Sequence, residues 1–450
     1  MNDARTIFAL ATPPGRSAVA IIRISGPEAR RAPSLFGAFC PDAGTFSVAR
    51  LRVDGHMVDQ VMVLFMQKPK SSTGEDVCEI HCHGSQAVIT ALLDRLDRTL
   101  GFRMALPGEF SRRSFMNGKM DLSAVEGLAD LIDSQTPAQL HQAWAQIDGA
   151  LRAPVMAWRE ALVGIAAELE ALIDFADEDL PKTVMTELQE KTGLLIADLA
   201  AGLNDGGAGE LVRDGVTVVL IGPVNAGKST ILNGIAGRAA AIVSDEAGTT
   251  RDIIQVHLDL GGIPARLLDT AGIRADSGVV ESEGIRRARA AADTADLALV
   301  VLDGSADDWP AQLANINGLA RGDQILVLNK ADRASAVACP DALADRAAGA
   351  VRISAKNPAD IERLVAILTA RLVPHNHAES SVMITRARHR EAMQAAHDAL
   401  VRALGHDFND APELAAEDFR LAATALGRIT GEIDVEELLG RIFSAFCIGK

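Results

Sequence analysis

The chain has 450 residues, of which 48% are hydrophobic and 4% aromatic, and it contains no tyrosine. A chain of this length is expected to form about two to four domains, and cores of Leu, Ile, Val and Ala suit helices and α/β sheets better than an aromatic-rich β-sandwich. The formal net charge of −16 argues against nonspecific nucleic-acid binding, because phosphate contacts need a basic surface. A local basic patch or a partner protein could still supply that charge.

The cysteines are odd in number and irregularly spaced, so we expect a reducing compartment and no disulfide framework. They are Cys40, Cys78, Cys82, Cys339 and Cys447. The first residues, MNDARTIFALATPPG, show no signal-peptide pattern, and no apolar run reaches the ~20 residues that span a bilayer. The sequence therefore predicts a cytoplasmic protein with no membrane contact.

Residues 1–118 are predicted to form a small α+β domain. Short segments rich in β-branched residues and bounded by Gly, Pro or Ser predict strands, and apolar residues at helical spacing predict a helix over 88–100. The expected strands are 18–25, 61–67 and 77–83.

Residues 119–213 are predicted to be helical. Segments 123–133 and 138–175 carry apolar residues three and four apart, as amphipathic helices do. Pro154 is expected to kink or interrupt the second segment, because proline removes a helical hydrogen bond. Residues 202–209, GLNDGGAG, are expected to form a flexible junction.

Residues 214–372 alternate between strand and helix patterns, which predicts a parallel, doubly wound sheet. The expected strands are 216–221, 265–268, 297–302 and 324–328. Over 373–450 the helical pattern returns, in 387–404, 411–426 and 435–446. The predicted fold is multidomain α/β and α+β, with an α/β domain inserted into a split helical domain, since a domain inserts easily where its termini lie close together.

Residues 222–229, GPVNAGKS, fit the P-loop pattern G-x4-G-K-[ST]. The segment follows the expected strand 216–221 and precedes a helix, which is the context that the motif requires. Glycines let backbone N–H groups face a phosphate, and the helix N-terminus adds partial positive charge. Lys228 would reach the β- and γ-phosphates, and Ser229 would ligate Mg²⁺.

Three further elements follow in the order typical of GTPases. Asp269–Gly272 (DTAG) would hold Mg²⁺ through water and contact the γ-phosphate. In Asn329–Asp332 (NKAD), Asp332 can accept two hydrogen bonds from guanine N1–H and N2–H₂, a donor pair that adenine lacks. Ser354–Lys356 (SAK) would lie behind the base. Each element alone is a weak signal, but four in order on one βα framework are very specific.

The residues that promote hydrolysis are harder to identify. Ras-like GTPases orient water with a Gln just after DxxG, but Ile273 stands there and cannot do so. Glu281 is a candidate carboxylate for this role, and Glu283 is its competitor. A Thr of the GTTRD segment 248–252 could close on Mg²⁺ and the γ-phosphate, although a plain polar loop is the alternative.

No arginine finger is identifiable in the sequence. The amide oxygen of Asn225 could instead hold a monovalent cation beside the phosphates, where a finger would place its charge. Asn225 could equally be a loop-capping residue.

At the level of the whole chain, several segments carry a resemblance to the MnmE (TrmE) family of tRNA-modifying GTPases. They are ATPPGRSAVAIIRISG, TGEDVCEIHCHG, LPGEFSRRSFMNGKMDL, GPVNAGKST, GTTRD, DTAGIR, NKAD and the terminal CIGK. The resemblance implies an N-terminal domain (1–118) that binds tetrahydrofolate and forms a homodimer, a helical domain in two parts (119–213 and 373–450), and a G domain (214–372).

The resemblance further implies a potassium-dependent GTPase that acts with a flavoprotein of the MnmG (GidA) type in a heterotetramer. Together they would add an aminomethyl-type group to C5 of the wobble uridine 34 of certain tRNAs. A 5-formyl or 5,10-methylene tetrahydrofolate would supply the one-carbon unit, and the FAD would belong to the partner.

Family roles carry over residue by residue. The potassium ligands would be Asn225, Ser244, Glu246 and Thr249, and the Mg²⁺ ligands Ser229 and Thr250. Glu281 matches the carboxylate that positions water, so the expected catalytic set is Glu281, Lys228 and Thr250. Folate contacts would come from Arg23, Glu79, Lys119 and Lys450. The expected GTP-binding residues are Asn225, Ala226, Gly227, Lys228, Ser229, Thr230, Ser244, Asp245, Glu246, Ala247, Gly248, Thr249, Thr250, Asp269, Thr270, Ala271, Gly272, Asn329, Lys330, Ala331, Asp332, Ser354, Ala355 and Lys356.

The sequence departs from the family pattern at a few positions. Pro223 and Val224 stand where the order is usually x-Pro, which spares the phosphate ligands, and Glu246 replaces an apolar residue.

His81-Cys82-His83 suggests a metal site, but neighbours on a strand point to opposite faces, so a structural role is favoured. Cys447 is either redox-active or a small apolar residue, the second being favoured.

Two other functions remain open. One is a ribosome-assembly or membrane-associated GTPase of the same potassium-using class, and the other is a nucleotide-gated scaffold in which hydrolysis is incidental. Both leave the LPGEF and CIGK segments unexplained.

Overall fold

The computed structural model describes most of the chain and divides it into two compact units. The first unit comprises residues 1–129, 145–197 and 392–450, and the second comprises 130–144 and 198–391. The described residues are 5–174, 182–237, 241–242, 255–269, 293–306, 308–316, 323–333, 350–373, 384–408, 411–433, 436–444, 446 and 448–449.

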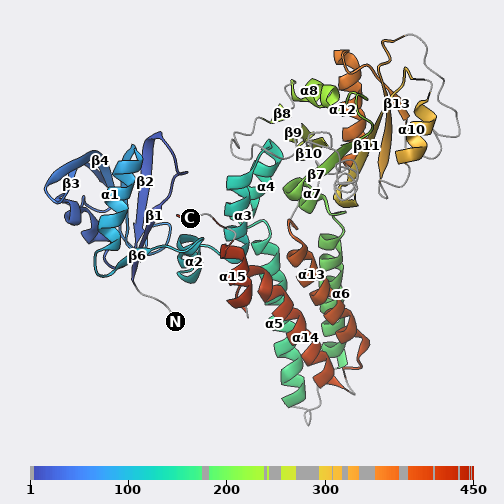
Figure 1. The fold of residues 1–450 in the computed structure, drawn as a ribbon. Helices are drawn as coiled ribbons and strands as arrows, with labels where there is room; N and C mark the ends of the chain where they lie inside the picture. The colour runs from blue at the N-terminus through green and yellow to red at the C-terminus, as the bar shows by residue number, and fades with distance from the viewer. Residues whose placement is uncertain are drawn as a thin grey trace. The chain divides into compact units, whose positions relative to one another are not determined.

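The first unit contains a six-stranded sheet of order β3-β4-β5-β2-β1-β6 (Figure 1). Its strands are β1 (Thr6–Leu10), β2 (Ser17–Ser25), β3 (Phe46–Val53), β4 (His56–Met66), β5 (Val77–Gly84) and β6 (Phe102–Met104). All pairs are antiparallel except β1–β6. Asp54 and Gly55 join β3 to β4 with positive φ at both positions, as tight hairpin turns require. The three predicted strands of this domain are therefore confirmed.

The two faces of this sheet have different neighbours. Cys78, Ile80 and Cys82 of β5 belong to a core shared with η1 (Ala29–Phe36) and α1 (Gln86–Asp97). Alternation along a strand places Glu79 on the opposite face. On that side Phe110 of α2 (Glu109–Met116) packs with Ile7 and Ala9 of β1 and with Ala105. A buried carboxylate thus lies on the face that α2 covers in part.

The helical part of the first unit is built around α5 (Arg152–Asp174), which packs along α14 (Pro412–Thr430). Lys191 links α6 (Lys182–Leu203) to Glu168 of α5, and Arg402 links α13 (Ala387–Gly405) to Asp418 of α14. A separate cluster joins α3 (Leu122–Asp133) to α15 (Glu436–Ser444) through Leu122, Val125, Leu439 and Phe443.

The segment 138–175 is largely helical, as predicted, but its interruption does not lie at Pro154. Two helices occupy this stretch, α4 (Pro137–Ile147) and α5, and the chain turns between them at Gly149, where φ is 95°. Pro154 causes no break because it lies in the first turn of α5, where a missing N–H removes no helical hydrogen bond.

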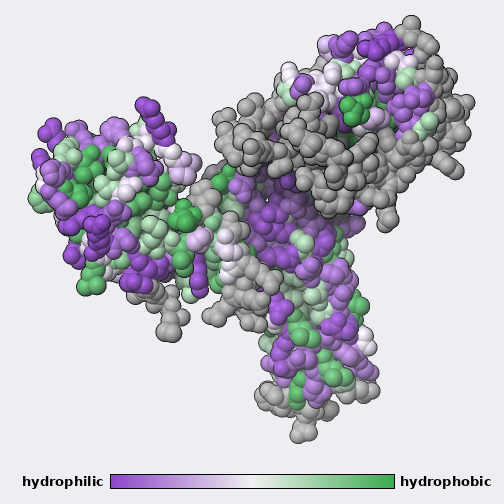
Figure 2. Space-filling model, in the orientation of Figure 1, coloured by the Kyte–Doolittle hydropathy of each residue, from purple (hydrophilic) through white to green (hydrophobic). Residues whose placement is uncertain are grey.

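None of the helices among the described residues combines the length and the apolarity needed to cross a membrane. Figure 2 shows hydrophilic residues spread along the visible surface of the helical part.

The second unit contains a seven-stranded sheet of order β13-β12-β11-β7-β10-β9-β8. Its strands are β7 (Val216–Ile221), β8 (Ala241–Ile242), β9 (Gln255–Leu260), β10 (Ile263–Asp269), β11 (Leu297–Asp303), β12 (Gln324–Asn329) and β13 (Ala350–Arg352). The expected parallel arrangement holds from β13 to β10. It fails at β9 and β8, which run antiparallel, because only Gly261 and Gly262 join β9 to β10 and so short a connection cannot cross over.

Helices cover both faces of this sheet. Ile231 and Ile235 of α8 (Lys228–Ala236) and Leu364 and Leu368 of α12 (Pro358–Leu372) belong to the core on one face. The other face has Trp309 of α10 (Trp309–Ile316) packed on Val300, Leu302, Leu326 and Leu328. The result is the doubly wound α/β domain that the sequence predicts.

The corner between α3 and α4 belongs to this second unit and hydrogen-bonds to the α/β domain. Thr136 Oγ1 donates to Gly262 O at 2.8 Å. Gln139 Nε2 donates to Arg213 O at 2.9 Å, and Gln142 Nε2 donates to Gly209 O at 3.0 Å. Both acceptors belong to α7 (Ala208–Asp214). The insertion is therefore held to helical residues at its base.

Candidate functional site

The loop 222–227 connects β7 to α8 and adopts a backbone that depends on glycine. φ is 155° at Gly222, 67° at Asn225 and 100° at Gly227. A Cβ on Gly222 would lie 2.0 Å from Val301 O, and one on Gly227 would lie 2.1 Å from Asn329 Nδ2. Only glycine fits such close approaches, so the P-loop spacing reflects the packing of this loop against β11 and β12.

Lys228 begins α8 and folds back over this loop. Its Nζ donates to Gly222 O at 2.6 Å and to Pro223 O at 2.8 Å, and the residue is 5% exposed. Burial lowers the pKa of Lys228, while the negative charge of Asp269 acts in the opposite direction. A buried ammonium at a helix N-terminus is a strong site for an anion such as phosphate.

Ser229 and Asp269 place two oxygens together at the end of β10. Ser229 Oγ donates to Asp269 Oδ2 at 2.9 Å, and Asp269 is fully buried. The parallel pairing of β10 with β7 sets Asp269 beside Leu220, immediately before the loop. A hydroxyl and a carboxylate are ligand types that Mg²⁺ takes in phosphate-binding sites, so the pair fits this ion.

A single buried side chain joins the phosphate loop to the two later elements. Asn329 is 2% exposed; its Nδ2 donates to Ala226 O and its Oδ1 accepts from Ala355 N, both at 2.9 Å. The structure thus brings the P-loop, NKAD and SAK residues together at the carboxyl edge of the sheet, where α/β proteins bind ligands.

Asp332 and Ser354 form the outer part of this arrangement. Ser354 Oγ donates to Asp332 Oδ1 at 2.8 Å, and Lys356 Nζ lies 3.7 Å from Asp332 Oδ2. The hydrogen bond from Ser354 is the main cause that lowers the pKa of Asp332. An ionised carboxylate only accepts hydrogen bonds, as recognition of the two guanine donors requires. Lys330 is turned away to Asp303, with Nζ 2.6 Å from Oδ2.

Several expected site residues lie outside the described residues. They are Ser244, Asp245, Glu246, Ala247, Gly248, Thr249, Thr250, Thr270, Ala271, Gly272, Glu281 and Lys450, together with Glu283 and Cys447. Their roles stay predictions.

A second cluster lies in the N-terminal sheet. Arg23 Nε donates to Glu79 Oε1 at 2.8 Å, and His81 Nε2 lies 3.1 Å from Glu79 Oε2. Burial acts to raise the pKa of Glu79, but Arg23 and His81 together lower it. Arg23 also lies over the ring of Phe110, 5.9 Å from its centre. Two of the four expected folate-binding residues are therefore in direct contact.

The other two expected folate-binding residues are Lys119, which the structure describes, and Lys450, which lies outside the described residues. Lys119 Nζ donates to Pro69 O at 3.0 Å, in the loop that precedes β5. Gly449, the neighbour of Lys450, is held against β1, since a Cβ there would lie 2.2 Å from Leu10 O. Ala9 of β1 is the register partner of Arg23 in β2, so Gly449 lies against the strand that neighbours Arg23.

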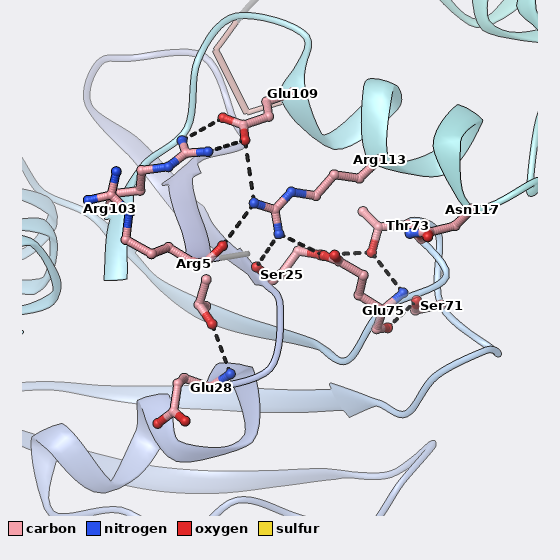
Figure 3. A network of polar contacts seen from close by, with 11 residues as sticks. Arg5, Ser25, Glu28, Ser71, Thr73, Glu75, Arg103, Glu109, Arg113 and Asn117 are labelled. Carbon is pink, nitrogen blue, oxygen red and sulfur yellow. Dashed lines mark hydrogen bonds and ion pairs between the residues drawn. The ribbon is translucent and has the colours of Figure 1, made fainter. Parts of the chain in front are cut away.

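The structure adds an ion-pair network that the motifs did not predict (Figure 3). Arg113 Nη1 donates to Glu75 Oε2 at 2.9 Å, Arg103 Nη1 donates to Glu109 Oε2 at 2.7 Å, and Glu109 also accepts from Arg113. Glu75 further accepts from Ser25 Oγ at 2.8 Å. Glu75 of the TGED segment and Glu109 of the LPGEF segment could have indicated this network, because a carboxylate is costly to bury without a partner.

No group of three potential metal-ligating side chains (His, Cys, Asp or Glu) occurs within the described residues. His81 contacts Glu79, and His83 Nδ1 lies 2.7 Å from Asp59 Oδ1. The part of the chain that is described therefore gives no support to a metal site at His81-Cys82-His83.

Comparison with known proteins covers nearly the whole chain. The family model for the GTP-binding protein TrmE N-terminus matches residues 6–119, and the model for the MnmE helical domain matches residues 122–447. The protein named tRNA modification GTPase MnmE from Parvibaculum lavamentivorans is 47% identical over 99% of this chain and 100% of its own length. Proteins of the same name from Caulobacter vibrioides and Phenylobacterium zucineum are 47% and 45% identical, with 99–100% coverage of both chains. The chain belongs to the MnmE family.

Proposed function

We propose that this protein is a GTPase that acts in tRNA modification, binding GTP at the carboxyl edge of the seven-stranded sheet. The observation that carries the proposal is the double hydrogen bond of Asn329 to the loop 222–227 and to Ala355. It sets the phosphate loop at a fixed position relative to Asp332, the residue expected to read the base. The name tRNA modification GTPase, shared by relatives over their full length, supports the role in tRNA modification.

Each part of the site has a distinct task. Lys228 and the N-terminus of α8 bind the β- and γ-phosphates, and Ser229 with Asp269 would hold Mg²⁺. That ion neutralises charge that develops on the phosphate oxygens during hydrolysis. Thr230 continues the first turn of α8, and Ser354 keeps Asp332 ionised toward guanine. The expected contacts from residues 244–250 and 270–272 complete the site.

Recognition of guanine can be tested at Asp332. Asp332→Asn replaces one acceptor oxygen with an NH₂ donor, which matches the C2 carbonyl of xanthine and opposes the N2 amine of guanine. We expect GTP affinity to fall by about 100-fold because charge-assisted hydrogen bonds to guanine are lost, and we expect the affinity for xanthosine triphosphate to rise. Titration with fluorescent nucleotides measures both. Equal GTP binding by the variant and the wild type would show that Asp332 does not recognise the base.

We further infer that hydrolysis depends on potassium. Asn225, Ser244, Glu246 and Thr249 would bind K⁺ beside the phosphates, and Glu281 would orient the attacking water. The left-handed backbone at Asn225 (φ 67°) is one that asparagine tolerates well, which supports a specialised loop conformation. The rate of GTP hydrolysis in KCl and in NaCl at equal ionic strength is the test. A higher rate in KCl that is lost in Asn225→Ala and Glu281→Ala supports both assignments, and a cation-independent rate that survives Glu281→Ala refutes them.

The remaining activities concern the N-terminal domain and partners. Arg23, Glu79, Lys119 and Lys450 would bind a 5-formyl or 5,10-methylene tetrahydrofolate, and the domain would form a homodimer. Within the described ranges, each oxygen of Glu79 has one hydrogen-bonded partner, which leaves a lone pair for an N–H donor of a pterin ring. A flavoprotein of the MnmG type, carrying FAD, would complete a heterotetramer that modifies C5 of uridine 34. Folate binding is measured by calorimetry, with Glu79→Gln expected to weaken it.

A further inference from the structure

Cys40 and Cys78 of the N-terminal domain have surroundings that differ from those of Cys82. Cys40, Cys78 and Cys82 are all reduced. Cys78 lies in β5 and is fully buried, whereas Cys40, in the loop between η1 and β3, is half-buried. The two residues are 38 positions apart in sequence, so the fold alone brings them together.

Backbone hydrogen bonds hold the Cys40 loop beside the strand that carries Cys78. Gly44 N donates to Phe65 O at 2.8 Å, and Phe65 N donates to Thr45 O at 3.4 Å. Phe65 is the residue directly opposite Cys78 in the β4–β5 pair. Cys40 packs against the core cluster that contains Cys78, and each of the two side chains shifts the pKa of the other.

A cation stands beside the more exposed thiol. The guanidinium of Arg30 lies over the Phe65 ring, 5.2 Å from its centre, and its charge favours a thiolate at Cys40. The hydrogen bond from Cys78 is the largest cause that lowers the pKa of Cys40, with Arg30 adding to it against burial and Asp76. The pKa of Cys78 is raised by the same hydrogen bond and by burial. One thiol of the pair therefore ionises first, and the other stays protonated.

Cys82 provides an internal comparison. It is buried in the same sheet, its Sγ donates to Ala20 O at 3.5 Å, and burial raises its pKa to about 11. Its surroundings are those of an inert structural cysteine, whereas Cys40 has the partial exposure, nearby cation and neighbouring thiol of redox-sensitive ones.

We propose that Cys40 and Cys78 are a peroxide-sensitive thiol pair that closes to an intramolecular disulfide. The Cys40 thiolate attacks one oxygen of hydrogen peroxide, the O–O bond breaks, and hydroxide leaves and takes up a proton to give water and a sulfenic acid at Cys40. Cys78 sulfur then attacks the Cys40 sulfur, and its proton goes to the departing hydroxide to form a second water. Two thiols lose two electrons and peroxide gains them, and a dithiol reductant reverses the reaction. Such transient disulfides are the kind expected in a reducing compartment.

The test uses the full-length protein, reduced, desalted and treated with hydrogen peroxide. Free thiols are then blocked with iodoacetamide, and peptides are mapped by mass spectrometry. We expect the peptides of Cys40 and Cys78 to appear cross-linked, about 2 Da lighter than their sum, and to separate on addition of dithiothreitol, while Cys82 is alkylated after denaturation throughout. Recovery of Cys40 and Cys78 as separate alkylated peptides after excess peroxide overturns the proposal, as does a disulfide from Cys40 to any other cysteine.

Three variants define the roles of the two sulfurs. Cys78→Val keeps an apolar side chain in the core and is expected to stop the reaction at the Cys40 sulfenic acid, which dimedone traps. Cys40→Ser, at the half-exposed position, is expected to abolish the cross-link. Cys82→Val is the matched control and is expected to form the disulfide as the wild type does. A cross-link to Cys78 that persists in Cys40→Ser, or the absence of dimedone labelling in a folded Cys78→Val protein, contradicts the assigned order.

Discussion

At the scale of single residues, the most informative side chain is the buried amide of Asn329. The sequence predicts that it belongs to the nucleotide site, and the motif spacing does not predict its contact with Ala226, 103 positions away. Long-range contacts of this kind depend on the order of strands in the sheet. The local motifs were predictable because each follows a strand and needs only a few neighbouring residues. The bond that joins them was not.

Asn329→Ala would leave Ala226 O and Ala355 N without their partner in a buried position. Two lost hydrogen bonds of about 1–2 kcal/mol each predict a GTP affinity at least about tenfold weaker, and a lower unfolding temperature of the α/β domain. Gln312→Ala is the control, since that amide donates to Asp308 on the exposed side of α10. Calorimetric titration with GTP compares the two, and equal effects of both variants would contradict a special role for Asn329.

The Arg23–Glu79 pair predicts a dependence of stability on pH. The pKa of Glu79 is lowered from its ordinary 4.5, so the folded state binds this proton less tightly than the unfolded state. Its stabilisation is present above pH 4.5 and is lost as pH falls through the lower pKa of the folded protein. Glu79→Gln removes this contribution.

Thermal unfolding between about pH 6 and pH 3 is the measurement for Glu79. The difference in unfolding temperature between the wild type and Glu79→Gln should shrink as the pH falls. Glu28→Gln, which disrupts an exposed pair with Arg31, is the control and should show only a small difference from the wild type, because exposed ion pairs contribute little. A gap between wild type and Glu79→Gln that widens on acidification is inconsistent with this account.

At the scale of elements, the sequence located buried strands well and connections poorly. β7, β11 and β12 were predicted within a residue, because continuous apolar runs indicate parallel strands covered on both faces. β9 was not predicted: its pattern, QVHLDL, carries polar residues suited to a strand near the edge. The break between α4 and α5 was misplaced because Pro154 is the stronger helix breaker in general, yet Gly149 takes the left-handed conformation that ends α4.

The β9–β10 turn tests how this hairpin docks on α4. A Cβ at Gly262 would lie 2.9 Å from Ala138 Cβ, whereas one at Gly261 would meet only Thr369 Cγ2, at 3.7 Å. Both glycines have positive φ, so alanine at either position costs about 1–2 kcal/mol in backbone strain. Gly262→Ala should cost about 1–2 kcal/mol more than Gly261→Ala, because the crowded contact must shift.

Chemical unfolding of the two alanine variants measures that difference. Gly261→Ala also places a Cβ at a positive φ, so the comparison removes the part of the backbone strain that both variants share, and the contact with Ala138 contributes to the remainder. Equal losses of stability in the two variants would show that α4 does not resist displacement at this turn.

At the scale of the whole molecule, residues distant in sequence make up each unit. Motifs and patterns in the sequence predict a G domain over 214–372. The second unit of the structure is larger, since it covers 198–391 and also includes 130–144. Local patterns do not reveal this, because α7 and the α3–α4 corner look like the rest of the helical sequence. Val212 of α7 nevertheless belongs to the core of the α/β domain and is 5% exposed.

The extent of this unit can be tested with fragments. A fragment of residues 198–391 should unfold at a higher temperature than one of residues 214–372, because only the longer one buries Val212. Val212→Ala should destabilise the longer fragment by about 1–3 kcal/mol. Its unfolding temperature should therefore move toward that of the shorter fragment. Differential scanning calorimetry with saturating GDP compares the three. Identical unfolding temperatures would show that α7 adds nothing to the α/β core.

The hydrogen bonds at the α3–α4 corner have a feature in common. Thr136, Gln139 and Gln142 all donate to main-chain carbonyls, those of Gly262, Arg213 and Gly209. A carbonyl oxygen is present whatever side chain follows it, so the receiving surface is defined by the path of the backbone and hardly by its sequence. Transplantation becomes feasible in consequence: a chimera in which residues 198–391 come from a distant relative keeps these three acceptors, provided that the turn at 261–262 and the helix at 208–214 retain their geometry.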